Sequence, residues 1–312
     1  MKISTPWFSL VQGAALSGCV ESSNSTSASD AGRGLVAPQV TKNPKIETVG
    51  QIIVSSDYSG DIRLLGETIN NGNADASFVE IKCSFYDATP NLIGEDFTFI
   101  VGTNLRFAQL GGSTNTALKP SDKGVFELLT TIKKSSVANF ECKYTYNVYD
   151  MALPAANLAL KGAVNAQKSG LGRLELLGQV VNSGSKGLTF GQIHFVIRDK
   201  VGVLSSVDSS FISGDTVVLS SIHSTTDTAL AVNATGTYSV GTSVPFSEYG
   251  SFEPKFEWSD SDIVNGVAAK PSTDGFLGDC CVINDPREKQ LIRNRNIEKL
   301  REAVEAASSV DL

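Results

Sequence analysis

Apolar and polar residues alternate one by one along many short stretches of this chain. The segment FVEIKCSFYD, which begins at Phe78, shows this period of two clearly. Its apolar positions are Val79, Ile81, Cys83 and Phe85. Successive side chains of a β-strand point to opposite faces, so the pattern predicts a strand with one buried face. The segment NFECKYTYNVY, which begins at Asn139, has the same period and places Cys142 on its apolar face.

Other segments with the same character follow at short intervals, separated by turn-forming residues. Further strands are expected at Thr48–Ser55, Asp61–Asn70, Leu92–Val101, Phe107–Leu118 and Gly124–Ile132. In GQIHFVIRD, the alternation turns Ile193, Phe195 and Ile197 inward and His194 outward. Many short antiparallel strands with turns between them are typical of an immunoglobulin-like (Ig-like) sandwich. The fold class expected is therefore mainly β.

A long internal repeat extends this interpretation to most of the chain. LLGETINNG begins at Leu64 and LLGQVVNSG begins at Leu176, an offset of 112 residues that continues without a gap. Other pairs at this offset are Phe78 and Phe190, Ile81 and Ile193, Asp87 and Asp199, Gly124 and Gly236, and Phe140 and Phe252. The repeat predicts two tandem β-sandwiches, at residues 47–150 and 157–260. Within LLGETINNG, the leucines, the glycines and Asn70 persist in the second copy, which favours packing and turn formation over ligand binding.

The C-terminal segment 284–309 differs in kind, because its pattern predicts an amphipathic helix after a linker at 261–283. Asp285 can cap the helix, Pro286 suits its first turn and Glu288 completes a capping box. Its narrow apolar stripe consists of Leu291, Ile297, Leu300 and Val304. Two interpretations remain open: the helix packs on the second repeat, or it docks on a partner or pairs with itself.

The N-terminus carries the pattern of a secretory signal, with a basic start, a short apolar segment and small residues. Its end, Leu16-Ser17-Gly18-Cys19, resembles a bacterial lipobox. The resemblance implies that residues 1–18 are a lipoprotein signal peptide and that Cys19 carries the lipid. The Ser-rich residues that follow cannot bury enough apolar surface to fold, so 19–46 is predicted to be a flexible tether. The alternative is an ordinary N-terminus with one stray cysteine.

The five cysteines supply the next candidate chemistry. Cys83 and Cys142 lie 59 positions apart on inward faces of two predicted strands, and both are absent together from the second copy. This pattern favours a cross-sheet disulfide formed in an oxidising compartment, with two buried free thiols as the alternative. Cys280 and Cys281 are adjacent, and could form a strained ring disulfide, bridge chains or stay unpaired.

Charge and histidine content narrow the range of functions. The net charge is −7, and no basic patch suggests nucleic acid as a partner. The only histidines are His194 and His223, so neither His-based catalysis nor a His-rich metal site is expected. Asp57 and Asp61 flank a turn whose second copy lacks carboxylates, which favours a hairpin over a calcium loop. We expect no cofactor, no metal site and no catalytic residues.

Two short segments resemble a known family. CSFYD, from Cys83 to Asp87, and FVIRD, from Phe195 to Asp199, look like imperfect copies of the FxLYD motif. The pattern Gly66, Asn70, Gly72 and its second copy resemble the strand end that precedes this motif in that family. The family consists of extracellular β-sandwich domains, often found in prokaryotic lipoproteins. The resemblance implies fold and location, and it implies no chemistry.

These expectations combine into one functional hypothesis. The chain is predicted to be a non-enzymatic protein of the cell envelope, anchored to the outer membrane or cell surface by a lipid on Cys19. It would act in protein interaction or surface structure, with an envelope protein as partner and helix 284–309 as one candidate contact. The alternatives are a surface module that binds glycans or small ligands, in which Tyr86 could stack on sugars, and a hydrolase whose site the sequence hides.

Overall fold

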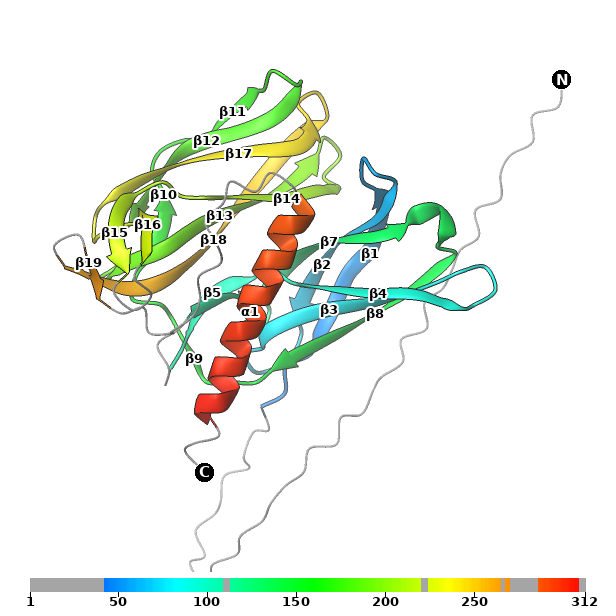
Figure 1. Cartoon of the computed structure of the whole chain (residues 1–312), viewed down its shortest axis with the longest axis horizontal. Helices are drawn as coiled ribbons and strands as arrows, with labels where there is room; N and C mark the ends of the chain where they lie inside the picture. Colours follow the sequence, from blue (N-terminus) through cyan, green and yellow to red (C-terminus); the bar gives the residue numbers. More distant parts are fainter. Residues whose placement is uncertain (1–41, 109–112, 220–223, 265–266, 270–285, 309–312) are drawn as a thin grey trace, which may run out of the picture. The chain divides into compact units, whose positions relative to one another are not determined.

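The computed structural model of this protein describes residues 42–108, 113–219, 224–264, 267–269 and 286–308 (Figure 1). Several predictions concern residues outside these ranges. They are the signal peptide at 1–18, most of the tether, Cys19, His223, most of the linker at 261–283, and Cys280, Cys281 and Asp285. These stay predictions.

The first half of the described chain, from β1 to β9 (residues 46–152), folds into three antiparallel sheets of three strands each. One contains β1 (Ile46–Ser56), β2 (Asp61–Asn70) and β7 (Lys123–Lys133), and a second contains β4 (Leu92–Phe99), β3 (Ser77–Tyr86) and β8 (Asn139–Asn147). A small third sheet contains β6 (Ser113–Ala117), β5 (Thr103–Phe107) and β9 (Met151–Ala152), and a 3₁₀ turn spans Lys134–Ser136. Leu64, Ile81, Phe85 and Phe126 belong to the core, where β2, β3 and β7 meet.

The second half of the described chain, from β10 to β19 (residues 158–269), is built from two sheets. The first contains β10 (Leu158–Leu160), β12 (Arg173–Asn182), β11 (Asn165–Lys168) and β17 (Thr235–Pro245). The second contains β14 (Leu204–Phe211), β13 (Gly187–Asp199), β18 (Tyr249–Val264), β19 (Val267–Ala269), β15 (Asp215–Leu219) and β16 (Ser224–Ala229). Leu176, Phe195 and Val240 lie in its core, together with Ile193 and Ile197. The predicted mainly-β, sandwich-like fold is therefore the fold that the structure shows.

The sequence offset of 112 residues is also an offset between strands. The bounds of β2, β4, β5 and β7 become those of β12, β14, β15 and β17 when 112 is added at each end. Phe78 and Phe190 even share an unusual positive φ, of 50° and 56°, where strand pairing shifts register. The repeat is thus a repeat of backbone structure. Because Lys42–Leu312 forms one compact unit, the boundaries 47–150 and 157–260 stay predictions.

Asn70 and Asn182 explain why the repeated segment ends as it does. Each side-chain amide is fully buried, and it bonds four backbone groups at Asn70 and five at Asn182. The partners of Asn70 are the carbonyls of Ala74 and Leu118 and the N–H groups of Lys45 and Gly72. A Cβ on Gly72 would lie 2.2 Å from the carbonyl oxygen of Asn43, because the chain passes directly over it. The segment is a strand leading into a turn, as its pattern predicts.

One strand prediction is wrong. The segment Phe107–Leu118 was expected to form one continuous strand, but Phe107 ends β5 and β6 begins only at Ser113. The two strands pair antiparallel with each other, and β5 also pairs with β9. The small sheet that results faces β18 of the second half, where the Ser113 hydroxyl donates to the carbonyl of Trp258 at 2.6 Å. Part of this segment therefore belongs to the junction between the halves.

Helix α1 (Pro286–Ser308) forms where the sequence predicts it. The interpretation that it packs on the second repeat is wrong. Ile297, Leu300 and Val304 are buried against Phe78 and Phe99 of the first half, not against the second repeat. Phe97, Phe107, Tyr149 and Met151 complete this apolar cluster. At the offset of 112, Ser209 replaces Phe97 and Leu219 replaces Phe107, so the first half offers the helix a more apolar face.

Leu291 does not share this burial, because its side chain is 59% exposed. It was assigned to the apolar stripe from spacing alone, and the helix turns it away from the first half. Among the residues described, no helix has both the length and the apolar character needed to cross a bilayer.

Candidate functional site

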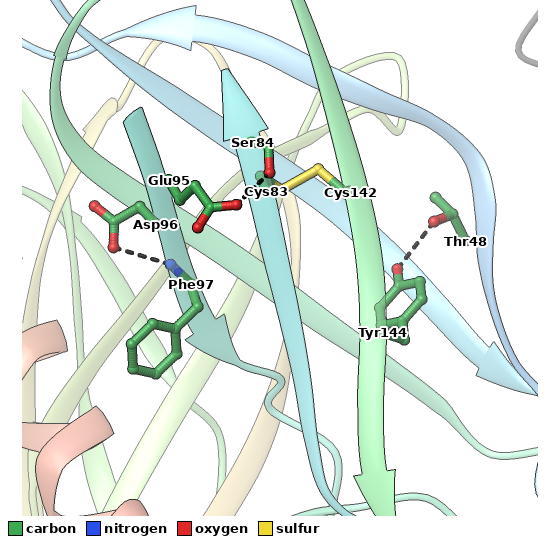
Figure 2. Close-up of a disulfide and its surroundings, with 8 residues drawn as sticks. All are labelled: Thr48, Cys83, Ser84, Glu95, Asp96, Phe97, Cys142 and Tyr144. Carbon is green, nitrogen blue, oxygen red and sulfur yellow. Dashed lines mark hydrogen bonds between the residues drawn. A yellow bond between two sulfur atoms is a disulfide. The ribbon is translucent and has the colours of Figure 1, made fainter. Parts of the chain in front are cut away.

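Cys83 and Cys142 form a disulfide (Figure 2). They are direct register partners on β3 and β8, with their Cα atoms 4.1 Å apart. The prediction of a bridge between two sheets is wrong in this respect, because β3 and β8 are neighbours in one sheet. Paired positions on antiparallel neighbours bring side chains close together, which is why the bridge can form there. A disulfide in a protein of this size is characteristic of oxidising compartments.

A polar seam joins the two halves along strand β14. This strand pairs with β13 on one side only, so its other edge presents unpaired backbone groups. Arg63 of β2 donates to the carbonyl of Ser205 at 3.0 Å, and Glu127 of β7 accepts from the N–H of Val207 at 2.7 Å. Arg63 also donates to Glu127 at 2.8 Å. Side chains of the first half thus cover a strand edge of the second.

Apolar and ionic contacts flank this seam. Leu65, Val101 and Val125 of the first half form one buried cluster with Val196 and Leu204 of the second. Arg198 of β13 forms an ion pair with Glu67 of β2. Burial of such a cluster favours the joined arrangement, and the directed bonds to β14 fix its register.

Asp208 gives the seam a group that titrates near neutral pH. Burial and the neighbouring charge of Glu127 raise the pKa of Asp208 to about 7, although the Ser206 hydroxyl and Arg63 favour its charged form. The Ser206 hydroxyl donates to its Oδ2 atom at 2.6 Å. Arg63 thus pairs directly with Glu127 and reaches Asp208 only through the Ser206 hydroxyl, to which it donates at 3.2 Å.

Arg293 of α1 connects the helix to both halves. Its guanidinium donates to the carbonyls of Phe99 and Ile100 at 2.9 and 2.8 Å and to Oδ1 of Asn115 at 3.1 Å. Its Nε atom also lies 4.0 Å from the Glu257 carboxylate on β18. One side chain therefore satisfies acceptors at the end of β4 and on β6, while its charge faces the second half.

His194 is buried beside Arg293, although the sequence placed it on an outward face. Its Nε2 atom lies 3.2 Å from Oε2 of Glu257 and 3.2 Å from Nδ2 of Asn115, and only 2% of the residue is exposed. The outward face of β13 is thus covered by the first half. Burial lowers the pKa of His194, against the opposing effect of Glu257. For Glu257, burial acts to raise the pKa, but the His194 bond and the Arg293 charge lower it overall.

A cleft of about 450 Å³ opens at the junction of the halves. Its lining comes from the start of β5, from the segment between β9 and β10, and from β18. The residues are Gly102, Thr103, Asn104, Leu153, Pro154, Ala156, Asn157, Leu158, Lys255, Phe256 and Trp258. Small-molecule sites usually measure about 300 to 1,000 Å³ and combine an apolar wall with few polar groups, and this cleft has that character.

Two residues of the cleft wall have buried polar atoms without hydrogen-bond partners. Neither Nδ2 nor Oδ1 of Asn104 is bonded, and neither is Nε1 of Trp258. The two residues are 8% and 7% exposed. An unpaired buried polar group costs about 1–3 kcal/mol, and the described residues contain several others, among them the Tyr238 hydroxyl. No pattern in the sequence marks either residue as functional.

Two other candidates from the sequence, the Asp57–Asp61 segment and Tyr86, lie among the described residues. Asp57 accepts from the N–H groups of Ser59 and Asp61, and both carboxylates are ion-paired with Arg287 of α1. This segment is the predicted hairpin turn. Tyr86, the candidate for sugar stacking, is half-buried at the end of β3. Within the described ranges, no group of three or more His, Cys, Asp or Glu side chains is placed to hold a metal ion.

The aspartates of the two FxLYD-like segments organise turns. Oδ1 of Asp87 accepts from the N–H groups of Thr89 and Asn91, at 2.8 and 2.9 Å. Oδ1 of Asp199 accepts from Val201 and Val203, both at 2.9 Å. The backbone bond from Asn91, the Asn91 amide and Thr89 together lower the pKa of Asp87 to about 2. The repeated aspartate is therefore explained by turn formation.

Fold and site together define a mainly-β protein with two structurally similar halves, a polar seam and a junction cleft. No protein-family model matches the chain, and no curated protein is detectably similar to it. The resemblance to the FxLYD family therefore stays a prediction based on the two short motifs.

Proposed function

We propose that the protein is an exported, lipid-anchored component of the cell envelope that works by binding rather than by catalysis. In this proposal, Cys19 carries the anchor, the tether holds the folded unit away from the membrane, and the joined β-sandwiches present the binding surface. The partner is another molecule of the envelope.

The disulfide between Cys83 and Cys142 carries this proposal. Disulfides persist in oxidising compartments such as the periplasm and the cell surface, and are rare in the cytosol. A disulfide downstream of Leu16–Cys19 supports the interpretation of that segment as an export and lipidation signal. The two features are independent, because one concerns an N-terminal pattern and the other a contact between β3 and β8.

The contacts at the junction support a binding role. The seam, the Arg293 contacts and the apolar cluster hold the halves in one arrangement, and binding to a preorganised surface costs less conformational entropy. The junction cleft is the observation that favours a ligand-binding role over a purely structural one. Its mainly apolar wall is what a bound molecule would contact.

Thiol labelling in intact cells tests the proposal. Cys83 and Cys142 should resist a membrane-permeant maleimide until the cells are treated with a reductant, and Cys83→Ala should expose Cys142 to the reagent without reduction. Labelling of both native thiols in unreduced cells would contradict export to an oxidising compartment.

Fractionation tests the anchor separately. The wild-type protein should sediment with membranes, and Cys19→Ala should release it to the soluble fraction. A Cys19→Ala protein that still sediments would show that the anchor lies elsewhere. Chemical cross-linking on intact cells should then capture an envelope partner of the wild-type protein.

A further inference from the structure

We propose that one end of the second half binds the surface of an anionic lipid bilayer. Two exposed apolar side chains, Leu171 and Val201, would enter the headgroup region, and the basic side chains around them would contact lipid phosphates. This inference goes beyond the proposed function, because it needs neither a lipid on Cys19 nor the junction cleft. Such a contact is reversible, so it is compatible with a tether that lets the folded unit extend from the membrane.

Three turns form this end of the second half (Figure 1). They connect β11 to β12, β13 to β14 and β17 to β18, at residues 168–173, 199–204 and 245–249. The N–H of Phe246 donates to the carbonyl of Gly172 at 3.0 Å, and Asp199 is the register partner of Tyr249. The turn between β17 and β18 therefore contacts the other two, and all three lie at the same end.

The apolar side chains stand at the tips of two of these turns. Leu171 is 84% exposed and Val201 is 83% exposed, the highest values among the large apolar side chains of the described residues. Each precedes a glycine with positive φ, 77° at Gly172 and 85° at Gly202. A side chain on such a tip projects outward, and a bilayer interface can take it up without a matching pocket. Its transfer out of water is favourable.

Basic side chains surround these tips. Lys168, Arg173 and Lys200 are exposed, and within the described part of the chain none of the three side chains forms an ion pair or a hydrogen bond. Of the acids on these turns, Asp199 accepts from two N–H groups of its own turn, and Glu248 is exposed. The exposed charge is therefore mainly positive, although the whole chain has a net charge of −7. Anionic bilayers attract lysine and arginine in this situation.

The first half lacks these side chains at the equivalent positions. At the offset of 112, the residues in place of Lys168, Leu171, Arg173, Lys200 and Val201 are Ser56, Ser59, Asp61, Ala88 and Thr89. The backbone of the turn is nevertheless alike, because Gly60 and Gly172 have φ values of 78° and 77°. Turn formation therefore does not require the apolar and basic side chains of the second half.

Sedimentation with lipid vesicles tests the proposal. The full chain carries Cys19→Ala in every sample, so that no lipid on this residue contributes. One set of vesicles contains phosphatidylcholine alone, and the other an equal mixture with phosphatidylglycerol. The protein should bind the mixed vesicles at least about tenfold more tightly, because several cations face the anionic lipid. Added sodium chloride should reduce this difference, because it screens exposed charges.

Variants of the tips and of the cations identify the surface. Leu171→Ser/Val201→Ser should weaken binding to the mixed vesicles by about tenfold or more, because less apolar surface leaves water. Lys168→Ala, Arg173→Ala and Lys200→Ala should each weaken it about fivefold. All of these positions are exposed, so the melting temperatures of the variants should stay close to that of the parent chain.

Two matched controls change the same kinds of side chain elsewhere. Tyr58→Ser removes an apolar side chain that is 82% exposed on the equivalent turn of the first half. Lys161→Ala removes an exposed cation whose backbone N–H bonds Gln179, away from the Arg173 end of β12. Neither control should change binding to the mixed vesicles.

Each opposite result overturns the proposal. These results are equal binding to the two kinds of vesicle, undiminished binding by Leu171→Ser/Val201→Ser, and an equal loss in Tyr58→Ser. If vesicles do not bind and Leu171→Ser/Val201→Ser converts a dimer to a monomer in sedimentation velocity, the surface is an interface between two copies instead. Because Cys19→Ala is present throughout, failure here leaves the thiol-labelling and fractionation tests of the proposed function unaffected.

Discussion

At the scale of single residues, the repeated positions serve the backbone. Asn70 and Asn182 hold equivalent turns through equivalent sets of bonds, and Asp87 and Asp199 do the same at the turns that follow β3 and β13. Each of these side chains replaces hydrogen bonds that a tight turn cannot make within its own backbone. A residue repeated for this reason reveals the fold and gives no information about a ligand.

Replacement of Asn70 tests this role. Asn70→Ala should lower the free energy of unfolding by about 2 to 4 kcal/mol, because it leaves several buried backbone groups unpaired. The exposed neighbour Asn71 provides the control, because Asn71→Ala should change the free energy of unfolding by no more than about 0.5 kcal/mol. Urea denaturation measures both, and similar losses in the two variants would refute the explanation.

At the scale of elements, α1 shows how one helix joins parts that are distant in sequence. Its apolar stripe packs on the first half, while Arg293 reaches acceptors on β6 and at the end of β4 and faces Glu257 of the second half. Arg301 adds an ion pair with Glu80, a carboxyl whose pKa burial raises despite that pairing. The helix is therefore part of the folded unit, and a partner would have to use its exposed side.

Two alanine variants of α1 distinguish the effect of these contacts on stability from an effect on helix formation. Arg293→Ala should destabilise the protein by about 3–5 kcal/mol, because it leaves the buried Glu257 without its cation and the carbonyls without donors. Arg295 lies two positions away on the exposed side of the helix. Arg295→Ala should therefore lower the free energy of unfolding by no more than about 0.5 kcal/mol. Thermal unfolding followed by circular dichroism distinguishes them, and equal melting temperatures would show that the Arg293 contacts contribute little.

The disulfide also acts at the scale of elements, because it joins β3 to β8. The bridge joins residues 59 positions apart. In the chain-entropy model, the double variant Cys83→Ala/Cys142→Ala should therefore have a free energy of unfolding about 4 kcal/mol lower than the wild type. Guanidinium denaturation with and without reductant measures this loss. Reductant should destabilise the wild type and leave the double variant unchanged; the same response in both would point to other thiols.

At the scale of the whole molecule, the seam decides how the two halves are joined. An exposed strand edge invites pairing with other chains, and here Arg63 and Glu127 cover the edge of β14. The same contacts place Asp208 near Glu127, Arg63 and Lys289, which are the charged groups that act on it. The seam between the halves therefore contains a carboxyl group that responds to pH near neutrality.

The pH dependence of stability should reveal Asp208. Its folded pKa, about 7, lies above its ordinary value, so the folded state binds this proton more tightly. The resulting stabilisation is complete below about pH 4 and is lost as pH rises through about 7. The stability difference between wild type and Asp208→Asn should therefore change across this window. Asp227→Asn, at an exposed position, is the control, and parallel wild-type and Asp208→Asn curves would exclude the effect.

Periodicity and repetition predicted much of the fold and little of the site. The alternation at Val79–Phe85 gave the buried face of β3, and the offset of 112 gave most strands of the second half once those of the first were known. His194 shows where sequence patterns stop being informative. The alternation correctly placed it opposite Ile193 and Phe195, but the surface that covers it includes Asn115, 79 positions away. Asn104 and Trp258 show it again, since an unpaired atom can be recognised only when all its neighbours are known.

What the sequence determined by itself is therefore local: strand faces, the turn fixed by Asn70, the position of α1 and its capacity for an amphipathic face. These follow from interactions within a few residues, or from a repeat that copies them. Only the tertiary structure decided that α1 packs on the first half, that Cys83 and Cys142 share one sheet, and that the halves meet at a polar seam beside a cleft. Those outcomes depend on which distant surfaces bury the most apolar area and satisfy the most polar groups, and that comparison exists only in the folded chain.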